Sequence, residues 1–437
     1  MDGRNLFNDG QHGFRRGRSC LSQLLEQHQY LINILENKKV ADVVHLDFSK
    51  AFDKVDHNIL LRKMQSLGIG GELIRWIENF LRNRKQLVAV DGFMSGEETL
   101  ISGVPQGSVL GPLLFLLHIG DIDHSLHHAT ASSFADDTRI TMKICSREDC
   151  DRMQNDLRAV YDWARVNNMD FNETKFEHIR FGPSEGLTGY TSANGTCIQT
   201  CQSVKDLGVI ISEDMKFEDQ ISDMVRKARR HAGLILRVFE TREKTAMLTL
   251  FKSIVIPLLE YCCQLWSPRT IGLIRKVEAV QRSFTYRITG MKDLDYWERL
   301  AQLNLYSLER RRDRYYIVYV WKIINGVAPN FSIDNMAIKT RNSPRRGLTC
   351  EVPPVNRAAP QRLQTIKEHS FMVHGPKLFN AIPRGLREFN GTLNTFKRNL
   401  DIFLRGVPDK PALAHYNQAA ANNGLLEQLA QQRIDDV

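Results

Sequence analysis

The sequence predicts a mixed α+β fold, in which short strands and helices alternate in the first half and helices dominate the second. Short apolar runs rich in β-branched residues, which are typical of strands, recur up to about residue 211. After residue 215 the apolar positions follow the helical period. A chain of 437 residues is too long for one compact domain and suits two or three.

The first predicted elements are a helix and a buried strand. Leucine and isoleucine recur at helical spacing through residues 19–37, and Ser19 is placed to cap that helix. The run Val40–Phe48 (VADVVHLDF) is apolar and β-branched. It predicts a buried strand that carries Asp47 at its end.

Two helices and a hairpin are predicted next. The helices cover about residues 58–64 and 72–81. Residues 85–90 and 98–101 are predicted to pair as the strands of a hairpin, because the Asp91-Gly92 pair between them favours a tight turn.

A loop and a second strand pair follow. The segment Ser102–Pro112 (SGVPQGSVLGP) holds three Gly and two Pro, which predicts a loop leading into a helix at residues 113–119. In residues 131–142 (ASSFADDTRITM), strand-like flanks surround Asp136 and Asp137. A regular strand would bury one of these two carboxylates at a cost, whereas a hairpin turn can present both to the same space.

The remaining strands and the first long helix of the second half complete the pattern. A helix is predicted at about residues 147–167, with strands at residues 176–181 and 204–211. An apolar stripe then runs from Ile221 to Val238 on one face of a helix. The basic residues of that helix lie mostly off the stripe, and they are Arg226, Lys227, Arg229 and Arg230.

The last third of the chain is predicted to contain less regular segments. Residues 340–362 are rich in Pro and Arg, which predicts a loop or linker. From about residue 408 the tail is polar and rich in Ala, Asn and Gln, as in a loose helix or a disordered segment. A basic cluster at residues 310–314 precedes the aromatic run Tyr315–Trp321, and it is equally consistent with RNA binding and with a helix core that has a solvated basic face.

Charge is distributed unevenly along the chain. The net charge is +9, but residues 1–215 hold 23 Lys and Arg against 29 Asp and Glu, whereas residues 216–437 hold 36 against 21. An acidic first half beside a basic second half indicates metal or catalytic chemistry in one and polyanion binding in the other. The alternative is that the basic excess only keeps the protein soluble.

Several classes of protein are disfavoured. The N-terminus has no basic region followed by an apolar run, so no signal peptide is expected, and no apolar stretch is long enough to predict a membrane span. Eight cysteines are too few for a disulfide framework and predict a reducing compartment. Cys197 and Cys201, like Cys262 and Cys263, lack a second ligand pair at tetrahedral spacing, so no structural zinc is expected.

The paired aspartates are the strongest chemical signal. Adjacent carboxylates are hard oxygen ligands suited to Mg²⁺. If the strand that ends on Asp47 lies beside the hairpin of Asp136 and Asp137, the three carboxylates can hold two cations about 4 Å apart, the spacing that serves phosphoryl transfer. One such pair by itself is more often a solvated turn.

The motifs around these residues resemble those of reverse transcriptases, specifically of jockey-like non-LTR retrotransposons. The resemblance is carried, in chain order, by QHGFRRGRSCLSQL (11–24), VVHLDFSKAFDKVDH (43–57), SGVPQGSVLGPLLFLL (102–117), FADDT (134–138), NETKFEHIRF (172–181), KDLGVIIS (205–212) and LEYCCQLWSP (259–268). The ordered likeness spans residues 11–270 and continues more loosely beyond. It is far more specific than any single motif.

The resemblance implies a right-hand polymerase with a ferredoxin-like palm. It implies partial fingers at residues 1–40, the palm at 41–215, a helical thumb at 216–300 and a C-terminal helical region at 301–437. The implied reaction is RNA-directed DNA synthesis, with an RNA template, a DNA primer and dNTPs as partners and two Mg²⁺ ions, or Mn²⁺, as cofactors. It also implies action in the nucleus and cytoplasm. Oligomeric state is not indicated.

The resemblance also assigns roles to individual residues. Asp47, Asp136 and Asp137 correspond to the catalytic carboxylates, and the Phe48 carbonyl to a further metal ligand. Lys175 corresponds to a proton donor for the pyrophosphate leaving group.

The other assigned residues contact substrates. Phe52 corresponds to a steric gate that excludes a ribose 2′-hydroxyl, although without the motif it reads as a core residue. Gln106 and Gly107 correspond to contacts with the incoming nucleotide, where Gly103 and Gly111 also allow close backbone approach. The candidates for nucleic-acid contact are Arg15, Arg16, Arg18, Arg226, Lys227, Arg229 and Arg230.

The sequence also departs from the family pattern. About ten residues precede the fingers motif, although the family has earlier fingers segments, and His118–Asp121 replaces a Tyr-Ile-Asn-Asp-like run. The expectation is therefore an N-terminally truncated polymerase, with a catalytically inactive nucleic-acid-binding remnant as the alternative. A third possibility is another template-dependent polymerase, such as an intron-encoded maturase.

Overall fold

The computed structural model describes residues 6–37, 39–183, 185–331, 337–409 and 424–435. It divides into two compact units, of which the first comprises Met1–Gln23 and Asn33–Leu207 and the second Leu24–Ile32 and Gly208–Val437. Helix α1 (Cys20–Glu36) contributes residues to both units. The predicted cap is confirmed, because the Ser19 hydroxyl accepts a hydrogen bond from the backbone N–H of Ser22.

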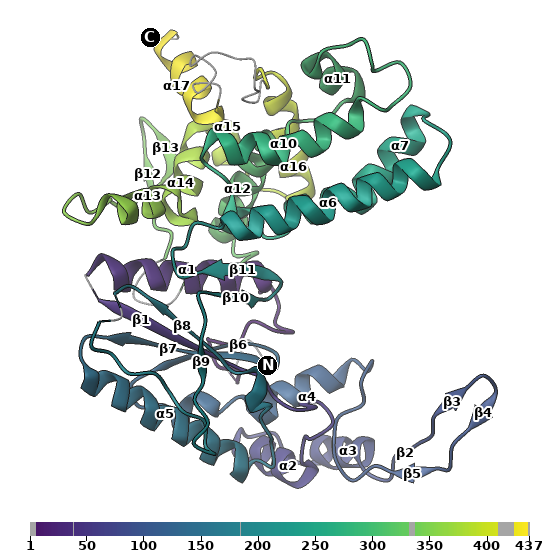
Figure 1. Cartoon of the computed structure of the whole chain (residues 1–437), viewed down its shortest axis with the longest axis vertical. Coiled ribbons are helices and arrows are strands. Elements are labelled where there is room, and N and C mark those ends of the chain that lie inside the picture. The colour runs from purple at the N-terminus through teal and green to yellow at the C-terminus, as the bar shows by residue number, and fades with distance from the viewer. Residues whose placement is uncertain (1–5, 38, 184, 332–336, 410–423, 436–437) are drawn as a thin grey trace. The chain divides into compact units, whose positions relative to one another are not determined.

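The first unit is built on a five-stranded sheet (Figure 1). The strand order is β6 (Thr130–Phe134), β7 (Asp137–Ile144), β1 (Val40–Leu46), β8 (Glu177–Phe181) and β9 (Gln199–Thr200). Strand β1 pairs antiparallel with both β7 and β8, and every residue of it except His45 is buried. A central, covered strand explains its run of valines. The fold is therefore mixed α+β, as predicted.

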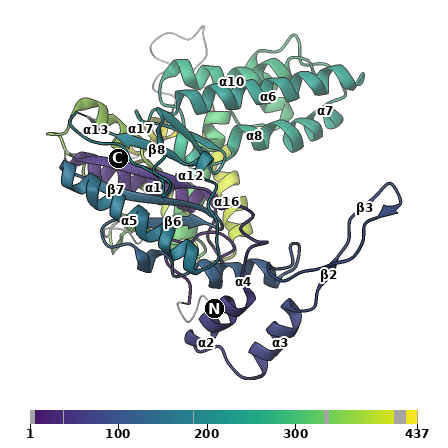
Figure 2. The ribbon, with the colours of Figure 1, turned by 60° about the horizontal axis from the view of Figure 1, so that its bottom comes forward.

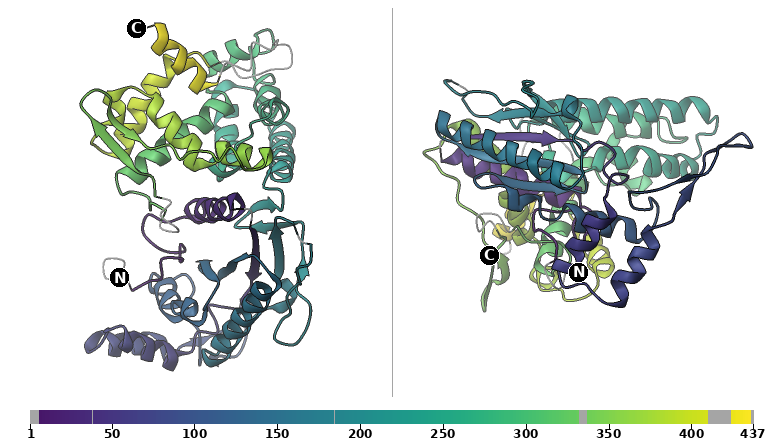
Figure 3. Two further views of the ribbon diagram at one scale, coloured as in Figure 1. Left: turned by 90° about the vertical axis from the view of Figure 1, so that its left-hand side faces the viewer. Right: turned by 90° about the horizontal axis from the view of Figure 1, so that it is seen from below.

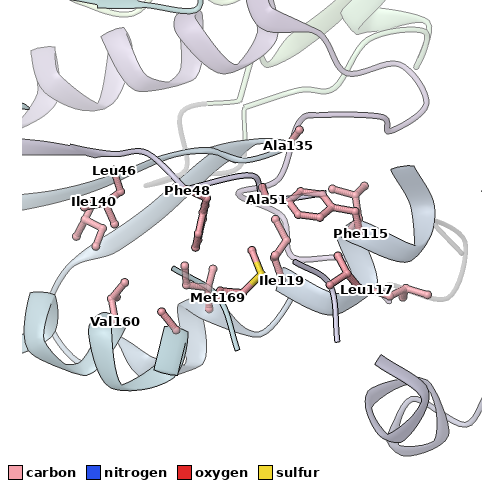
Figure 4. Close-up of a cluster of buried hydrophobic side chains, with 14 of the residues drawn as sticks. Leu46, Phe48, Ala51, Phe115, Leu117, Ile119, Ala135, Ile140, Val160 and Met169 are labelled. Atoms are coloured by element: carbon pink, nitrogen blue, oxygen red, sulfur yellow. The ribbon is translucent and has the colours of Figure 1, made fainter. Parts of the chain in front are cut away.

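Helices enclose the core of the first unit. They are α2 (His57–Ser66), α3 (Glu72–Leu81), α4 (Leu110–Ile119) and α5 (Arg147–Val166), with short 3-10 turns at η2 (Ile122–Ser125) and η3 (Glu173–Lys175). Figures 1 and 3 show α5 along one face of the sheet. In Figure 4, Leu46 and Ile140 from the sheet face Val160 from α5, with Phe115 and Ile119 from α4 beside them.

Two local predictions need correction. The loop predicted to end at Pro112 ends earlier, because α4 begins at Leu110 and a proline is tolerated in a first turn whose N–H groups have no helical partner. The single strand predicted at residues 204–211 is two strands, β10 (Ser203–Asp206) and β11 (Val209–Ser212). Leu207 and Gly208 interrupt it, since both have positive φ.

A hairpin arm, residues 85–99, extends from the first unit beyond α3 and α4 (Figures 1 and 2). Its antiparallel pairs are β2 (Lys85–Gln86) with β5 (Glu98–Thr99) and β3 (Ala89–Val90) with β4 (Phe93–Met94). The predicted turn is confirmed, with φ of 48° at Asp91 and 85° at Gly92. All eight strand residues are exposed.

The second unit is mainly helical (Figure 1). Its long helices are α6 (Glu218–Val238), α10 (Ile271–Thr285), α12 (Leu308–Ile324), α14 (Phe371–Ala381) and α16 (Leu393–Arg405). Shorter helical segments are α7 (Lys244–Leu250), the π-helical η4 (Phe251–Val255), α8 (Ile256–Glu260), α9 (Cys263–Trp266), α11 (Tyr296–Leu303), α13 (Gln361–His369), α15 (Arg384–Arg387) and α17 (Leu425–Asp435). The apolar stripe of α6 is buried as predicted, except that Val238 at its end is 63% exposed.

The segment predicted as a linker contains a hairpin. Strands β12 (Thr340–Ser343) and β13 (Gly347–Cys350) pair antiparallel within residues 340–362. The Asn380 side chain accepts from the Cys350 N–H at 2.7 Å and donates to its carbonyl at 2.8 Å. Side chains from distant helices thus satisfy backbone groups of this hairpin, which composition alone could not show.

The two interpretations of the basic and aromatic run at residues 310–321 are decided by burial. Arg310 and Arg312 are each 2% exposed, and Tyr316 and Trp321 are fully buried in α12. Arg310 donates to the carbonyl of Val407 at 3.2 Å and of Pro408 at 2.9 Å. The run is therefore a helix core, and the RNA-binding interpretation is wrong for these residues. The basic face expected to be solvated is instead buried at Arg310 and Arg312.

Two further expectations concern the chain ends and membranes. Of the polar tail from residue 408, residues 410–423 lie outside the described residues, whereas α17 follows and buries Leu425 and Leu429. Within the described ranges, no helix combines the length and the apolar character that crossing a bilayer requires.

Candidate active site

Asp47, Asp136 and Asp137 lie at the same end of two neighbouring strands. Asp47 directly follows β1, and β1 pairs with β7 so that Leu46 is opposite Thr138. Asp137 is the first residue of β7, and Asp136 precedes it in the turn from β6. The sheet thus gathers the three nominated carboxylates from two distant segments of the chain.

A two-residue turn presents the aspartate pair. Strands β6 and β7 end in the pair Phe134 and Asp137, which leaves Ala135 and Asp136 as the turn. Ala135 has a φ of 56°, in the left-handed region that strains a residue with a side chain. The hairpin expected at this position is present, with Asp136 partly exposed and Asp137 exposed.

The Gln11 side chain holds this turn in place. Its Oε1 accepts hydrogen bonds from the N–H of Ala135 at 2.9 Å and of Gly13 at 2.8 Å, and its Nε2 donates to the Ala135 carbonyl at 3.2 Å. Gln11 is 6% exposed, so little water competes for these bonds. A single buried amide therefore satisfies both backbone groups of the strained residue.

The sequence analysis assigned no role to Gln11. The signal was present in the glycines on either side of it. A Cβ on Gly13 would lie 2.3 Å from the Ala135 nitrogen, and one on Gly10 would lie 2.5 Å from the Ala131 carbonyl oxygen. Only glycine permits so close an approach of the N-terminal segment to β6 and its turn.

Burial and mutual repulsion define the electrostatics of the carboxylates. Burial raises the pKa of Asp136, and the charge of Asp47 raises it further. Burial likewise raises the pKa of Asp137, with added repulsion from Asp136, Asp206 and Asp47. These carboxylates therefore ionise less readily than ordinary ones, and a nearby cation would relieve the repulsion.

Lys175 is the cation that approaches Asp47 most directly. Its Nζ donates to the Asp47 Oδ2 at 3.0 Å, and its side chain is 61% exposed. Lys175 is the last residue of η3, and Asn172 directly precedes this turn. The Asn172 N–H donates a hydrogen bond to the Asp47 carbonyl at 2.8 Å, which holds η3 next to Asp47. An exposed ion pair of this kind is weak, so the ammonium group can leave Asp47 for a substrate.

The Phe48 carbonyl is free to serve as a further oxygen ligand. Phe48 forms an isolated antiparallel bridge with Phe171. The two hydrogen bonds of this bridge are made by neighbouring residues: the Asn172 N–H donates to the Asp47 carbonyl, and the Ser49 N–H donates to the Asp170 carbonyl. Phe48 is therefore the non-hydrogen-bonded partner, whose own carbonyl takes no part in the pairing. Its ring is anchored by stacking on Phe171, with centroids 4.5 Å apart.

The donor set fits a divalent cation by its chemistry and charge. Carboxylate and carbonyl oxygens are the ligands that Mg²⁺ prefers. Burial is the main cause of the raised pKa values of the aspartate pair, and repulsion between the neighbouring carboxylates adds to it. In the part of the chain that the structure describes, no three His, Cys, Asp or Glu side chains converge tightly enough to enclose an ion. The fit therefore rests on the kind of donors rather than on a formed cage.

Phe52 and the Gln106 loop lie against one another. The Val104 N–H donates to the Phe52 carbonyl at 2.9 Å, and Gln106 Nε2 donates to Asp53 Oδ1 at 2.9 Å. Gly103 has a φ of 84°, and a Cβ there would meet the Asp53 carbonyl oxygen at 2.8 Å. The two segments nominated for nucleotide contact are therefore packed together.

The Phe52 side chain also has a structural role, and Gly107 is required by its backbone conformation. The Phe52 ring stacks on Phe115 with centroids 4.3 Å apart and is partly buried, so it also belongs to the core. Gly107 has a φ of 80° with open space where a Cβ would be, so its backbone conformation rather than crowding requires glycine.

The three N-terminal arginines differ in their engagement. Arg15 donates to the Asn8 carbonyl at 2.6 Å, and its guanidinium lies over the Phe7 ring. Arg18 pairs with Asp9 at 3.1 Å. Arg16 is exposed and pairs with no described residue, so it is the most available of the three.

The basic residues of α6, in the second unit, also fall into two groups. Arg226 and Lys227 share Asp223 as an ion-pair partner, at 2.5 Å each. Arg229 and Arg230 are exposed, and within the described ranges neither pairs with an acidic group. A groove of 650 Å³ beside α10 contains Arg229 together with Arg282, Arg287 and Arg299.

Comparison with known proteins identifies the domain that carries the carboxylates. Residues 1–211 match the family model described as reverse transcriptase (RNA-dependent DNA polymerase). The chain carries a reverse transcriptase domain. It includes Gln11, the three aspartates and Lys175, and the resemblance drawn from the ordered motifs is confirmed.

The relatives that this chain matches come from non-LTR retrotransposons. It is 26% identical over 338 residues to the probable RNA-directed DNA polymerase from transposon X-element of Drosophila melanogaster, covering 72% of this chain and 37% of the relative. It is 28% identical over 291 residues to the RNA-directed DNA polymerase from mobile element jockey of the same species, covering 64% and 32%. The chain thus spans about a third of the length of these relatives.

Among solved structures, the chain is similar to telomerases from two Candida species. The structure of telomerase from Candida albicans with a fragment of telomeric RNA gives a TM-score of 0.38 at 11% identity, covering 64% of this chain and 52% of that chain. Apo telomerase from Candida tropicalis gives 0.38 at 11% identity, covering 70% and 50%.

Proposed function

We propose that this chain is an active RNA-directed DNA polymerase that extends a DNA primer on an RNA template. The observation that carries the proposal is the meeting of Asp47, Asp136 and Asp137 at one end of the paired strands β1 and β7. Burial and mutual repulsion raise the pKa of the aspartate pair, which suits a site that binds divalent cations.

The three aspartates, with the Phe48 carbonyl, would hold two Mg²⁺ ions, or Mn²⁺. Bound there, such ions lower the pKa of the primer 3′-hydroxyl and neutralise charge on the transferring phosphoryl group. The 3′-hydroxyl would lose its proton to solvent and its oxygen would form a bond to the α-phosphorus of a dNTP, while the bond from that phosphorus to the bridging oxygen breaks and releases pyrophosphate. The turn at Ala135, whose φ is positive, would set the direction in which Asp136 and Asp137 present their carboxylates.

Lys175 is proposed to give a proton to the departing pyrophosphate. Its exposed ammonium group is held by Asp47 at 3.0 Å. When Asp47 binds a metal ion instead of Lys175, the ammonium group of Lys175 becomes available to the phosphates. Because the ion pair is exposed, breaking it leaves neither group buried without a partner. The 3-10 turn η3 keeps the side chain on the carboxylate side of the sheet.

Nucleotide selection is proposed to depend on Phe52, Gln106 and Gly107. The Phe52 ring is braced by Phe115, so it resists displacement by a ribose 2′-hydroxyl. Gln106 lies on the neighbouring loop, where exposure lets its amide contact an incoming nucleotide. Deoxyribonucleotides, and hence a DNA product, are the expected result.

The division into palm, fingers and thumb is also proposed. Strands β1, β6, β7 and β8, joined through helices in the chain order βαββαβ and lying in the order β6-β7-β1-β8, have the ferredoxin-like arrangement of a palm. We assign residues 41–215 to the palm, 1–40 to partial fingers, 216–300 to the thumb and 301–437 to a C-terminal helical region.

Nucleic-acid contacts are proposed for two basic regions. On the thumb, Arg229 and Arg230 carry charges that no described acidic group offsets, and the groove beside α10 adds three arginines. Guanidinium groups so placed hold phosphates without reading sequence. In the fingers, Arg16 is the exposed cation, whereas Arg15 and Arg18 support the local loop.

Primer extension on an RNA template, with Mg²⁺ and dNTPs, tests the proposal. Wild type is compared with a variant carrying Asp136→Ala and Asp137→Ala, and the expected result is extension by wild type alone. The matched control carries Glu97→Ala and Glu98→Ala, which remove an adjacent acidic pair from the exposed hairpin arm. Extension by the control at the wild-type rate would place the chemistry on the nominated pair.

Two outcomes would count against polymerase activity on these residues. Equal extension by wild type and the Asp136 and Asp137 variant would move the chemistry elsewhere. No extension by folded wild type that still binds primer–template would favour a nucleic-acid-binding protein without catalysis.

A further inference from the structure

The second unit contains an arginine-lined groove beside the hairpin β12–β13. The groove has a volume of 1130 Å³, and among its described lining residues one is acidic, Glu351. Five of the described lining residues are arginines, and they are Arg341, Arg345, Arg346, Arg384 and Arg387. Such a density of guanidinium groups on one surface favours the binding of a polyanion.

Two of these arginines fasten the hairpin rather than face a ligand. Arg387 is 8% exposed and donates to the carbonyls of Ile382 at 3.1 Å and of Arg346 at 3.0 Å. Arg384 donates to the Pro344 carbonyl at 3.2 Å. The backbone of the turn is therefore held by two arginine side chains of α15.

The turn is also held from its other side. Gly347 has a φ of 63°, and a Cβ there would lie 2.1 Å from Glu388 Oε1. That oxygen accepts from the Leu348 N–H at 3.1 Å and from Arg384 Nε at 2.9 Å. The backbone that carries Arg345 and Arg346 is thus fixed before any ligand arrives, which lowers the entropy cost of binding.

The charges at the tip of the turn are free to act on a ligand. Arg345 and Arg346 are exposed, and within the described ranges neither guanidinium pairs with an acidic group. Arg341 pairs with Glu351 at 2.6 Å, but its side chain is 77% exposed, so the pair is weak and exchangeable. Three guanidinium groups can therefore turn to an incoming anion.

We propose that this groove binds a phosphodiester backbone, as a second nucleic-acid-binding surface outside the reverse transcriptase domain. The planar fork of a guanidinium matches phosphate oxygens in pairs. Phe403 is the one aromatic residue among the described lining residues, so contact through phosphates rather than stacked bases is expected. RNA and DNA share this chemistry. The surface needs neither metal nor polymerase activity.

Binding by the full chain tests the surface directly. Fluorescence anisotropy is measured with a labelled single-stranded RNA and with DNA of the same sequence, in EDTA and without dNTPs. The variant carries Arg345→Glu and Arg346→Glu. We expect roughly tenfold weaker binding at low salt and a slope of log K against log salt that is smaller by about 1.4, because two phosphate contacts with a single strand are lost. A second variant with Arg345→Ala and Arg346→Ala should show a smaller loss in the same direction.

The matched control changes the net charge of the protein by the same amount, at positions outside the groove. It carries Arg62→Glu and Arg158→Glu, at two exposed positions of the first unit, and should bind as wild type does. A loss on RNA, on DNA or on both supports the surface and identifies its ligand. Equal losses in variant and control, or none in either, would overturn it. Displacement of RNA by polyglutamate of matched charge as effectively as by unlabelled RNA would instead assign the groove to an acidic protein segment.

Discussion

The side-chain amide of Gln11 bonds to both the N–H and the carbonyl of Ala135, with distances of 2.9 Å and 3.2 Å. Ala135 precedes the aspartate pair and has a φ of 56°. A residue at the start of the chain thus stabilises a conformation that Ala135 would not adopt by preference. The position of the Asp136 carboxylate depends on this contact across 124 residues of sequence.

Replacing Gln11 should therefore weaken metal use more than nucleic-acid binding. In Gln11→Ala, two buried N–H groups and one carbonyl lose their partner, each at about 1–3 kcal/mol. We expect a several-fold higher half-saturating Mg²⁺ concentration and about tenfold slower primer extension, with unchanged primer–template affinity. Gln11→Glu, which keeps the acceptor but loses the donor, should lie between. Gln65→Ala, at an exposed position, is the control. An unaltered Mg²⁺ dependence in Gln11→Ala would contradict the role.

Shortening Phe52 should admit ribonucleotides. The ring stacks on Phe115 at 4.3 Å, so Phe52→Val opens space and also costs about 1–3 kcal/mol of stability. The ratio of rNTP to dNTP incorporation should rise at least tenfold. The comparison variant is Phe80→Val, another partly buried aromatic, which stacks on Trp76. If both variants lose stability and neither changes sugar selection, Phe52 is a core residue alone.

The raised pKa values of Asp136 and Asp137 predict how stability varies with pH. The folded protein retains protons there that the unfolded chain releases, so the free energy of unfolding should fall as pH rises from the usual Asp range through the raised pKa values. Asp136→Asn with Asp137→Asn should flatten this dependence in EDTA. Mg²⁺ should raise the Tm of wild type at neutral pH and leave that of the variant unchanged. Thermal unfolding across pH, with and without Mg²⁺, measures both effects. A steep pH dependence retained by the variant would assign it to other groups.

Two pairs of residues on α6 offer a test of nucleic-acid binding within one helix. Arg229→Ala with Arg230→Ala removes cations that no described acidic group offsets, so the salt slope of binding should fall by about two. Arg226→Ala with Lys227→Ala removes cations already paired with Asp223 and should weaken binding less. Anisotropy with primer–template over a range of salt compares the two. Equal effects would show that the pairing with Asp223 does not matter.

The sequence predicted most of what is local in the first unit. Ser19 capping α1 and the Asp91-Gly92 turn of the hairpin arm depend on a few neighbouring residues, and both are present. The ordered motifs predicted the reverse transcriptase domain that the family comparison shows. The meeting of Asp47 with the aspartate pair also followed, because strand ends in one sheet constrain each other.

Contacts between distant residues could not be predicted in the same way. Gln11 acts on a turn far along the chain, and the pattern of apolar residues does not record that contact. The hairpin β12–β13 depends on Asn380 and Arg387, which lie well beyond it. Arg310 appeared to be a surface cation until the structure showed carbonyl groups around its guanidinium.

The exposed hairpin arm has a practical consequence for handling the purified protein. Phe93 is 81% exposed and Met94 73%, on short strands whose outer edges pair with no strand among the described residues. Concentrated solutions and high ionic strength will favour self-association through this segment. Because β2 and β5 form their own ladder at the base, replacing residues 88–95 with a short turn keeps that ladder and removes the apolar tip. The shortened protein should stay monodisperse at concentrations that crystallisation requires.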